Sequence, residues 1–147
     1  MKFIKHAICL AIIAMAFFAV PIQAKKVKKD IYIFGCSASF SDSIIYITNV
    51  QVLKDAEIDS KSKVLIHRDM YSSQLKDFLT EEMRQPHRTC FVIFADKEKA
   101  AMKKYEKVKK LYTVKSKGKF EVQFLTDDDF RFTLVHDDED ETVESER

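Results

Sequence analysis

The sequence predicts an α+β fold, in which one small domain has a mixed sheet with two amphipathic helices packed on it. Three observations lead to this prediction. The chain has 147 residues and is 46% hydrophobic and 33% charged, the size and composition of a single globular domain. Short runs of β-branched and aromatic residues lie near both ends and in the middle of the chain. Two longer segments between these runs repeat their apolar residues at helical spacing. The predicted order of elements is β-β-α-β-α-β-β.

The first two predicted strands form an antiparallel hairpin. The apolar run from Ile31 to Phe34 ends at Gly35 and is typical of a strand buried on both faces. A turn-rich stretch with three serines follows at 37–42, and a second strand is expected over residues 43–52. The polar segment 54–63, with a short apolar piece at 64–66 after it, is expected to be a loop with room for a brief strand.

The first helix is expected over residues 69–83. Its apolar residues recur at helical spacing, and the carboxylate of Asp69 can accept hydrogen bonds from the free backbone N–H groups of a first turn. Pro86 prevents the helix from continuing. The run at 90–95 that follows is the most hydrophobic stretch after the first two dozen residues, so we expect it to be a central strand.

The second helix is expected to be capped by Asp96 and to be strongly amphipathic. Four apolar residues share its inner face: Ala101, Tyr105, Val108 and Tyr112. Lysine occupies seven of the fourteen positions from 97 to 110, and Lys99, Lys103 and Lys110 fall on the opposite face. This basic face would attract an anionic partner. Nucleic acid is not expected as that partner, because the two tyrosines of the helix point inward and cannot stack on bases.

Two strands with alternating apolar residues are expected at the end of the domain. Residues 120–124 and 130–134 each place aromatic or aliphatic side chains at every second position. The acidic turn Asp127 to Asp129 joins them. The pattern predicts an antiparallel pair.

Charge and hydropathy divide the chain into four segments. Residues 1–24 have a basic start, an apolar run and a small residue at Ala24, as a secretory signal peptide does, so cleavage after Ala24 is expected. A basic flexible leader at 25–30, a globular domain at 31–136 and an acidic disordered tail at 137–147 are expected to follow. Residues 25–136 hold 22 basic and 16 acidic side chains, whereas the tail holds seven acidic side chains and Arg147.

The signal peptide predicts an exported protein, either periplasmic or secreted, with no stable membrane span after cleavage. The stretch from Ala7 to Ala24 has 18 residues, fewer than the roughly 20 that a spanning helix needs. The alternative is a protein that keeps this segment as a membrane anchor. Four lysines shortly after the apolar run favour that alternative, because basic flanks prefer the cytoplasmic side.

Export would leave two cysteines in the chain, Cys36 and Cys90. In an oxidising compartment they could close a long loop with a disulfide. Both also lie in or beside apolar strands, where a cysteine is a small buried hydrophobic residue. The sequence leaves both alternatives open.

Local motifs for catalysis and metal binding are weak. Cys36 or Ser37, beside Gly35, could act as the nucleophile of a small hydrolase or thiol enzyme, with His67 or His87 as the base. However, this turn leads into a strand and lacks the second glycine of a hydrolase nucleophile elbow. No metal site and no cofactor are expected, since the histidines are scattered singly and none has a second ligand at metal-binding spacing.

These observations favour an exported binding or envelope-support protein without a catalytic role. The expected partner is an anionic envelope component or another protein, and the expected contacts are Lys99, Lys103 and Lys110. The alternative is the small hydrolase or thiol enzyme centred on Cys36 or Ser37.

Overall fold

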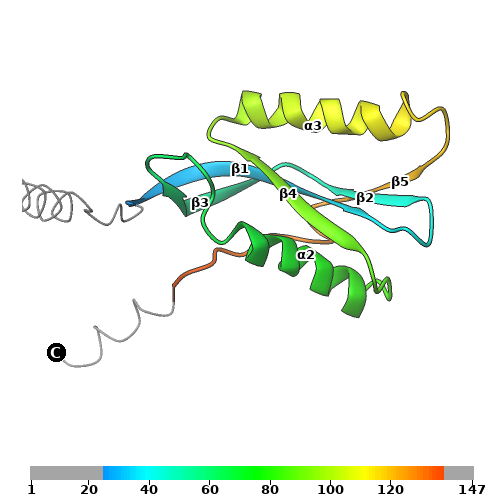
Figure 1. Cartoon of the computed structure of the whole chain (residues 1–147), viewed down its shortest axis with the longest axis horizontal. Coiled ribbons are helices and arrows are strands. Elements are labelled where there is room, and N and C mark those ends of the chain that lie inside the picture. Colours follow the sequence, from blue (N-terminus) through cyan, green and yellow to red (C-terminus); the bar gives the residue numbers. More distant parts are fainter. Residues whose placement is uncertain (1–24, 138–147) are drawn as a thin grey trace, which may run out of the picture.

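The computed structural model describes residues 25–137 as one mixed sheet of five strands with two helices (Figure 1), which confirms the predicted α+β fold class. The strands are β1 (Lys26–Ala38), β2 (Ile44–Thr48), β3 (Gln51–Asp59), β4 (Thr89–Ala95) and β5 (Glu121–Leu125), and the helices are α2 (Arg68–Glu81) and α3 (Glu98–Thr113). The predicted signal peptide at 1–24, and all but the first residue of the predicted acidic tail, lie outside the described residues.

The central strand of the sheet is β1. On one edge, β2 and β3 follow each other along it, because Cys36 pairs with Ile47 and Ile33 pairs with Gln51. Strand β4 pairs antiparallel with β1 over residues 32–38, so it occupies the other edge. Strand β5 pairs parallel with β2. The predicted hairpin is therefore present as β1 and β2, and the sheet mixes antiparallel and parallel pairs.

The two helices cover opposite faces of the sheet (Figure 1). Helix α2 buries the predicted stripe of Tyr71, Leu75 and Leu79 in the larger core, together with Ile31 and Ile33 of β1. These two β1 residues are two positions apart, so their side chains point to the same face.

The other face of β1 is covered by α3. The side chains of Phe34 and Cys36 form part of a second core, against which Tyr105, Val108 and Tyr112 of α3 pack. The rings of Phe34 and Tyr105 meet edge to face, with their centroids 5.4 Å apart. The inward face predicted for this helix is thus confirmed.

Gly35 allows α2 to approach the sheet closely. A Cβ atom at this position would lie 2.7 Å from Leu75 Cδ2 and 3.1 Å from Phe132 Cζ. Both distances are shorter than ordinary van der Waals contacts between carbon atoms. The missing side chain therefore creates the space in which the helix and the C-terminal segment pack.

Strand β3 occupies most of the segment that we expected to be a loop. Its buried apolar residues are Leu53, Ala56 and Ile58, so the spacing between them is three residues and then two. The register of β3 against β1 shifts between Lys29 and Ile31, which shows a bulge. The bulge breaks the alternation by which a strand is recognised, so the prediction of a loop was wrong.

The prediction that residues 25–30 form a flexible basic leader is also wrong. Residues Lys26 to Lys29 pair with β3 and form the first part of β1. The side chains here are exposed, which gave the sequence the appearance of a mobile leader.

The segment from Phe130 to Val135 is extended but is not a strand, so the predicted final antiparallel pair is absent from the described residues. Phe130, Phe132 and Val135 are buried in the α2 core. The alternation was recognised correctly, but it reflects an extended segment packed beside α2.

The predicted helix caps are wrong. Helix α2 begins after His67, which has a left-handed backbone with φ of 59° and makes no side-chain capping bond. Asp69 lies inside the first turn, where its charge favours the positive end of the helix dipole. Helix α3 begins after Lys97, and Asp96 forms an ion pair with Lys29 instead.

Candidate functional site

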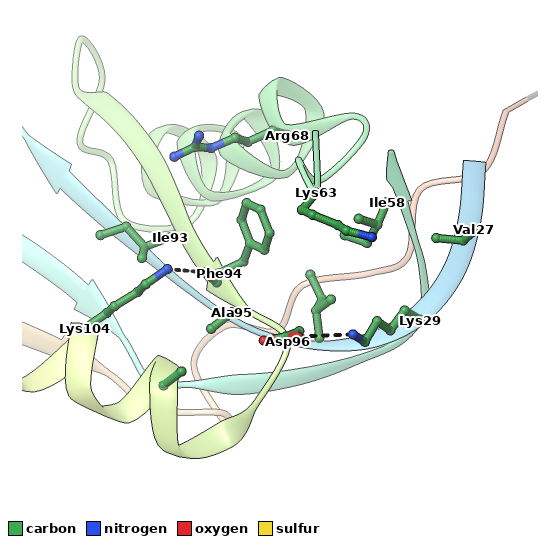
Figure 2. Close-up of a pocket in the computed structure, with 12 residues that line it drawn as sticks. Val27, Lys29, Ile58, Lys63, Arg68, Ile93, Phe94, Ala95, Asp96 and Lys104 are labelled. Atoms are coloured by element: carbon green, nitrogen blue, oxygen red, sulfur yellow. Dashed lines mark hydrogen bonds and ion pairs between the residues drawn. The ribbon is translucent and has the colours of Figure 1, made fainter. Parts of the chain in front are cut away.

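A groove of about 620 Å³ opens where β4 leaves the sheet (Figure 2). It is lined by residues of β1, β3, β4, α2, α3 and two connecting segments. Four of the lining side chains are basic, one is acidic and seven are apolar. The basic ones are Lys29, Lys63, Arg68 and Lys104, the acidic one is Asp96, and Ile31, Ile58, Ile93 and Phe94 are among the apolar ones.

Three of the basic groups are held by bonds to β4 or to the turn after it. Lys29 Nζ lies 3.2 Å from Asp96 Oδ2, and Lys104 Nζ donates a hydrogen bond to the Phe94 carbonyl oxygen at 3.0 Å. Arg68 donates to the Val92 carbonyl oxygen at 2.9 Å. Only Asp96 contributes a compensating charge to the groove, and its pKa is lowered by the hydrogen bond and charge of Lys29. The groove therefore carries an excess of positive charge.

An open strand edge borders the groove. Strand β4 ends at Ala95, which pairs with Tyr32, so β1 has no partner strand on that edge from Lys26 to Ile31 among the described residues. Val27, Lys29 and Ile31 line the groove at every second position. An unpaired edge presents backbone N–H and C=O groups to an extended ligand.

The lysines predicted as binding residues lie elsewhere. Lys99, Lys103 and Lys110 are exposed on α3. Lys103 and Lys110 border a shallow hollow of about 490 Å³ together with three neighbours, Glu106, Lys107 and Lys115. Only lysine and glutamate side chains line this hollow, so the carbon stems of these residues are its apolar surface. Lys104 of the same helix instead lines the groove. The groove could not be predicted from local patterns, because its basic residues come from four separate segments of the chain.

The two predicted nucleophiles are buried. Cys36 is 1% exposed within the α3 core, and this burial raises the pKa of its thiol to about 12. Ser37 is fully buried, and its hydroxyl oxygen accepts a hydrogen bond from Arg88 Nε at 3.0 Å. Neither residue has a histidine as a hydrogen-bond partner among the described residues, since His87 is exposed and His67 pairs with acidic groups. The geometry needed for a thiol or serine enzyme is therefore not present at either residue.

Both cysteines are free thiols. Cys36 packs in the core beneath α3, whereas Cys90 pairs with Ser37 across the strands and packs against the core beneath α2. Adjacent residues of a strand point to opposite faces. The two sulfur atoms thus lie on opposite faces of the sheet, and Cys36 and Cys90 do not form a disulfide.

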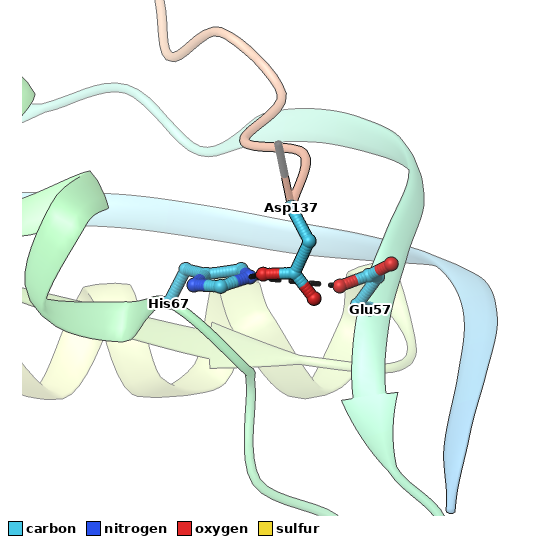
Figure 3. A group of neighbouring side chains, drawn as sticks. All are labelled: Glu57, His67 and Asp137. Carbon is cyan, nitrogen blue, oxygen red and sulfur yellow. Dashed lines mark ion pairs between the residues drawn. The ribbon is translucent and has the colours of Figure 1, made fainter. Parts of the chain in front are cut away.

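A second polar cluster lies beside the start of α2. Figure 3 shows His67 from the segment before α2, Glu57 from β3 and Asp137 from the C-terminal segment turned toward one another. His67 Nε2 is 2.8 Å from Asp137 Oδ1 and 3.6 Å from Glu57 Oε2. Lys26 Nζ lies 3.8 Å from Glu57 Oε2 and also contacts Asp137. Sequence reasoning named only His67, because its neighbours here come from distant parts of the chain.

Comparison with protein families, with curated proteins and with solved structures finds no match for this chain. None of the helices within residues 25–137 is both long enough and apolar enough to cross a membrane.

Proposed function

We propose that this protein is an exported, non-catalytic binding protein that holds an extended acidic segment of a partner protein along the open edge of β1. The observation that carries the proposal is the coincidence of an unpaired strand edge with a groove that has four basic and seven apolar lining residues. Each feature alone is common on protein surfaces, but together they match the needs of one kind of ligand.

Strand addition explains how such a ligand would be held. Backbone hydrogen bonds to residues 26–31 of β1 would supply affinity, and every second ligand side chain would face the groove. Acidic side chains there would meet Lys29, Lys63 and Lys104, and small apolar ones would meet Val27 and Phe94. The basic groups would also raise the association rate of an acidic segment.

The charge of the edge selects the partner. A second copy of this chain that paired edge to edge would bring Lys26, Lys28 and Lys29 against the same lysines. Like charges on facing edges discourage such pairing. An acidic partner segment is attracted by the same residues.

Export fits this proposal but depends on the signal peptide. Strand β1 begins at Lys26, close after the expected cleavage point at Ala24, so the proposed mature chain would retain the whole described domain. Mass spectrometry of the protein recovered from the periplasm or the medium would test this. A product beginning at Lys25 supports cleavage, and an intact N-terminus in the membrane fraction supports the anchor.

The binding proposal can be tested with a fluorescein-labelled peptide of Glu-Val repeats, using a Lys-Val peptide of equal length as the ligand control. Fluorescence anisotropy should show binding of the acidic peptide only. Hydrogen exchange should slow at the amides of residues 26–31 when this peptide is present.

Charge reversals at the groove and on the outer face of α3 separate the groove from the predicted lysine face. We expect Lys63→Glu together with Lys104→Glu to weaken binding of the Glu-Val peptide by about tenfold or more. The control is Lys99→Glu together with Lys103→Glu, which changes the net charge by the same amount but on the outer face of α3. It should weaken binding of the peptide much less. Equal losses in both double variants, or no change in exchange at 26–31, would contradict the groove as the binding site.

A further inference from the structure

The cluster of Glu57, His67 and Asp137 has the composition of a metal site. One imidazole nitrogen and two carboxylate oxygens are available, and these ligand atoms all lie within 4.8 Å of one another. Zinc is bound in proteins by nitrogen of histidine and oxygen of aspartate or glutamate, and sites with three protein ligands keep one position open.

An unsatisfied buried carboxylate gives independent support. The side chain of Glu57 is 9% exposed, and its Oε2 atom accepts no hydrogen bond from the described residues. The His67 Nε2 atom is likewise buried without a hydrogen bond, although Asp137 Oδ1 lies 2.8 Å away. That oxygen therefore lies off the direction in which Nε2 could donate a hydrogen bond. A buried charged oxygen without a partner is costly, and a cation among the three groups would remove the cost.

The separations of the ligand atoms suit a small divalent ion. Two ligands about 2.0–2.1 Å from zinc at a tetrahedral angle lie about 3.3 Å apart. The distance from His67 Nε2 is 2.8 Å to Asp137 Oδ1 and 3.6 Å to Glu57 Oε2. Shifts of about 0.5 Å in the side chains are enough to bring both of these distances to the required value.

Lys26 is the positive group that now faces these carboxylates. Its ammonium contacts Asp137 and lies 3.8 Å from Glu57 Oε2. Its side chain is 45% exposed, so it can turn into solvent. Lysine and a metal ion would compete for the same oxygens.

We propose that Glu57 Oε2, His67 Nε2 and Asp137 Oδ1 form a three-ligand site for Zn²⁺, and that the Lys26 ammonium competes with the ion for the two carboxylates. The ligands come from β3, from the residue before α2 and from the C-terminal segment. A bound ion would therefore fasten that segment to the sheet and to α2. The site shares no lining residue with the groove, so the two proposals stand independently.

The test is titration of the full chain, freed of metal with a chelator, with zinc sulfate in a calorimeter. We expect one Zn²⁺ per chain and a rise in the melting temperature when zinc is present, because the ion would bind only the folded state. Cobalt(II) in place of zinc should give the visible absorption of a low-coordinate nitrogen and oxygen site.

Matched variants separate this site from adventitious binding. His67 and His87 both have left-handed backbones, with φ of 59° and 64°, so His67→Asn and His87→Asn make equal demands on the backbone. We expect His67→Asn and Glu57→Gln to weaken zinc binding by about tenfold or more, and His87→Asn to leave it unchanged. Lys26→Gln should strengthen binding, because the competing ammonium is gone.

Absence of zinc binding to the wild-type chain would overturn the proposal. So would an equal loss in the His67→Asn and His87→Asn variants, or unchanged affinity in His67→Asn. Circular dichroism must show that each variant is folded, and if Glu57→Gln does not fold, His67→Asn still decides the question.

Discussion

The Gln51 side chain pairs with the backbone of Phe132 across 81 positions of sequence. Phe132 N donates to Gln51 Oε1 at 2.9 Å, and Gln51 Nε2 donates to the Phe130 carbonyl oxygen at 2.8 Å. Gln74 of α2 likewise donates to the Thr133 carbonyl oxygen and accepts from the Thr133 amide. Two glutamine side-chain amides thus hydrogen-bond to the backbone of an extended segment that has no partner strand within residues 25–137.

Replacing Gln51 by leucine should destabilise the protein. The change leaves the Phe130 carbonyl and the Phe132 amide buried without partners, which costs about 1–3 kcal/mol for each group. Urea unfolding would measure the loss. The control is Gln85→Leu, because the side chain of Gln85 has no hydrogen bond among the described residues and is half-buried. Equal effects of the two changes would contradict a specific role for Gln51.

Replacing Gly35 by alanine should cost about 1–3 kcal/mol of unfolding free energy, because the new methyl group overlaps the Leu75 side chain. A double-mutant cycle with Leu75→Val isolates this contact. The alanine should be better tolerated beside valine, by about 0.5 kcal/mol or more. Strictly additive effects would mean that the contact does not limit the packing.

Arg88 joins the ends of three strands through the bonds of its buried side chain. It is 3% exposed, and it bonds to Ser37, to both oxygens of Asp42 and to the Ile44 carbonyl. Removing it in Arg88→Ala should cost about 3 kcal/mol. Arg88→Lys should recover only part of the lost stability, since lysine lacks the planar guanidinium group that bonds to several partners at once.

Arg131→Ala is the control for Arg88, because Arg131 is exposed and makes a single bond to the Asp127 carbonyl. It should change the unfolding free energy by about 0.5 kcal/mol at most. A full rescue by Arg88→Lys would show that charge alone accounts for the effect of Arg88.

Stability should fall at alkaline pH because of Cys36. Its pKa is raised by burial from 9.0 in the unfolded chain to about 12 in the fold. Between these values the unfolded state loses a proton that the folded state keeps, so rising pH favours unfolding. The stabilisation is complete below pH 9 and is lost as pH approaches 12.

Unfolding in urea at a series of pH values would measure this slope, and Cys36→Ala should reduce it. An identical slope in the variant would assign the alkaline loss to other groups, such as Tyr71 and Tyr105, whose pKa values burial also raises. As an independent check, a thiol reagent at pH 8 should modify Cys36 only after unfolding.

The acidic tail should weaken binding to anionic surfaces. Residues 138–147 hold six acidic side chains and Arg147, beside a domain with an excess of basic ones. A chain that ends at Asp137 should elute from a heparin column at higher salt. Changing the six acids to their amides should have the same effect if charge is the cause. Unchanged elution of both variants would show that the tail does not screen the domain.

Local patterns were sufficient to predict the two helices and most of the sheet. The buried stripes of α2 and α3 repeat at a spacing that only a helix places on one face, and the apolar runs of β1 and β4 are short and rich in β-branched residues. Strand β3 was missed because its bulge shifts the alternation, and the C-terminal segment was taken for a strand because burial on one side gives the same pattern.

The candidate sites were hidden for a different reason. Lys29, Lys63, Arg68 and Lys104 stand far apart in the chain, and Glu57, His67 and Asp137 have no motif spacing. Neither set can be recognised until the sheet order is known, because no local pattern records which distant segments become neighbours.

The sequence by itself determined the fold class, the inward faces of the helices and the segment expected to direct export, since each depends on the order of residues within a short window. Only the tertiary structure decided that Cys36 and Cys90 stay apart, that Cys36 and Ser37 are sealed from solvent, and that a basic groove lies beside the open edge of β1. These properties depend on strand pairing and on which face of the sheet each helix covers, and long-range packing sets both.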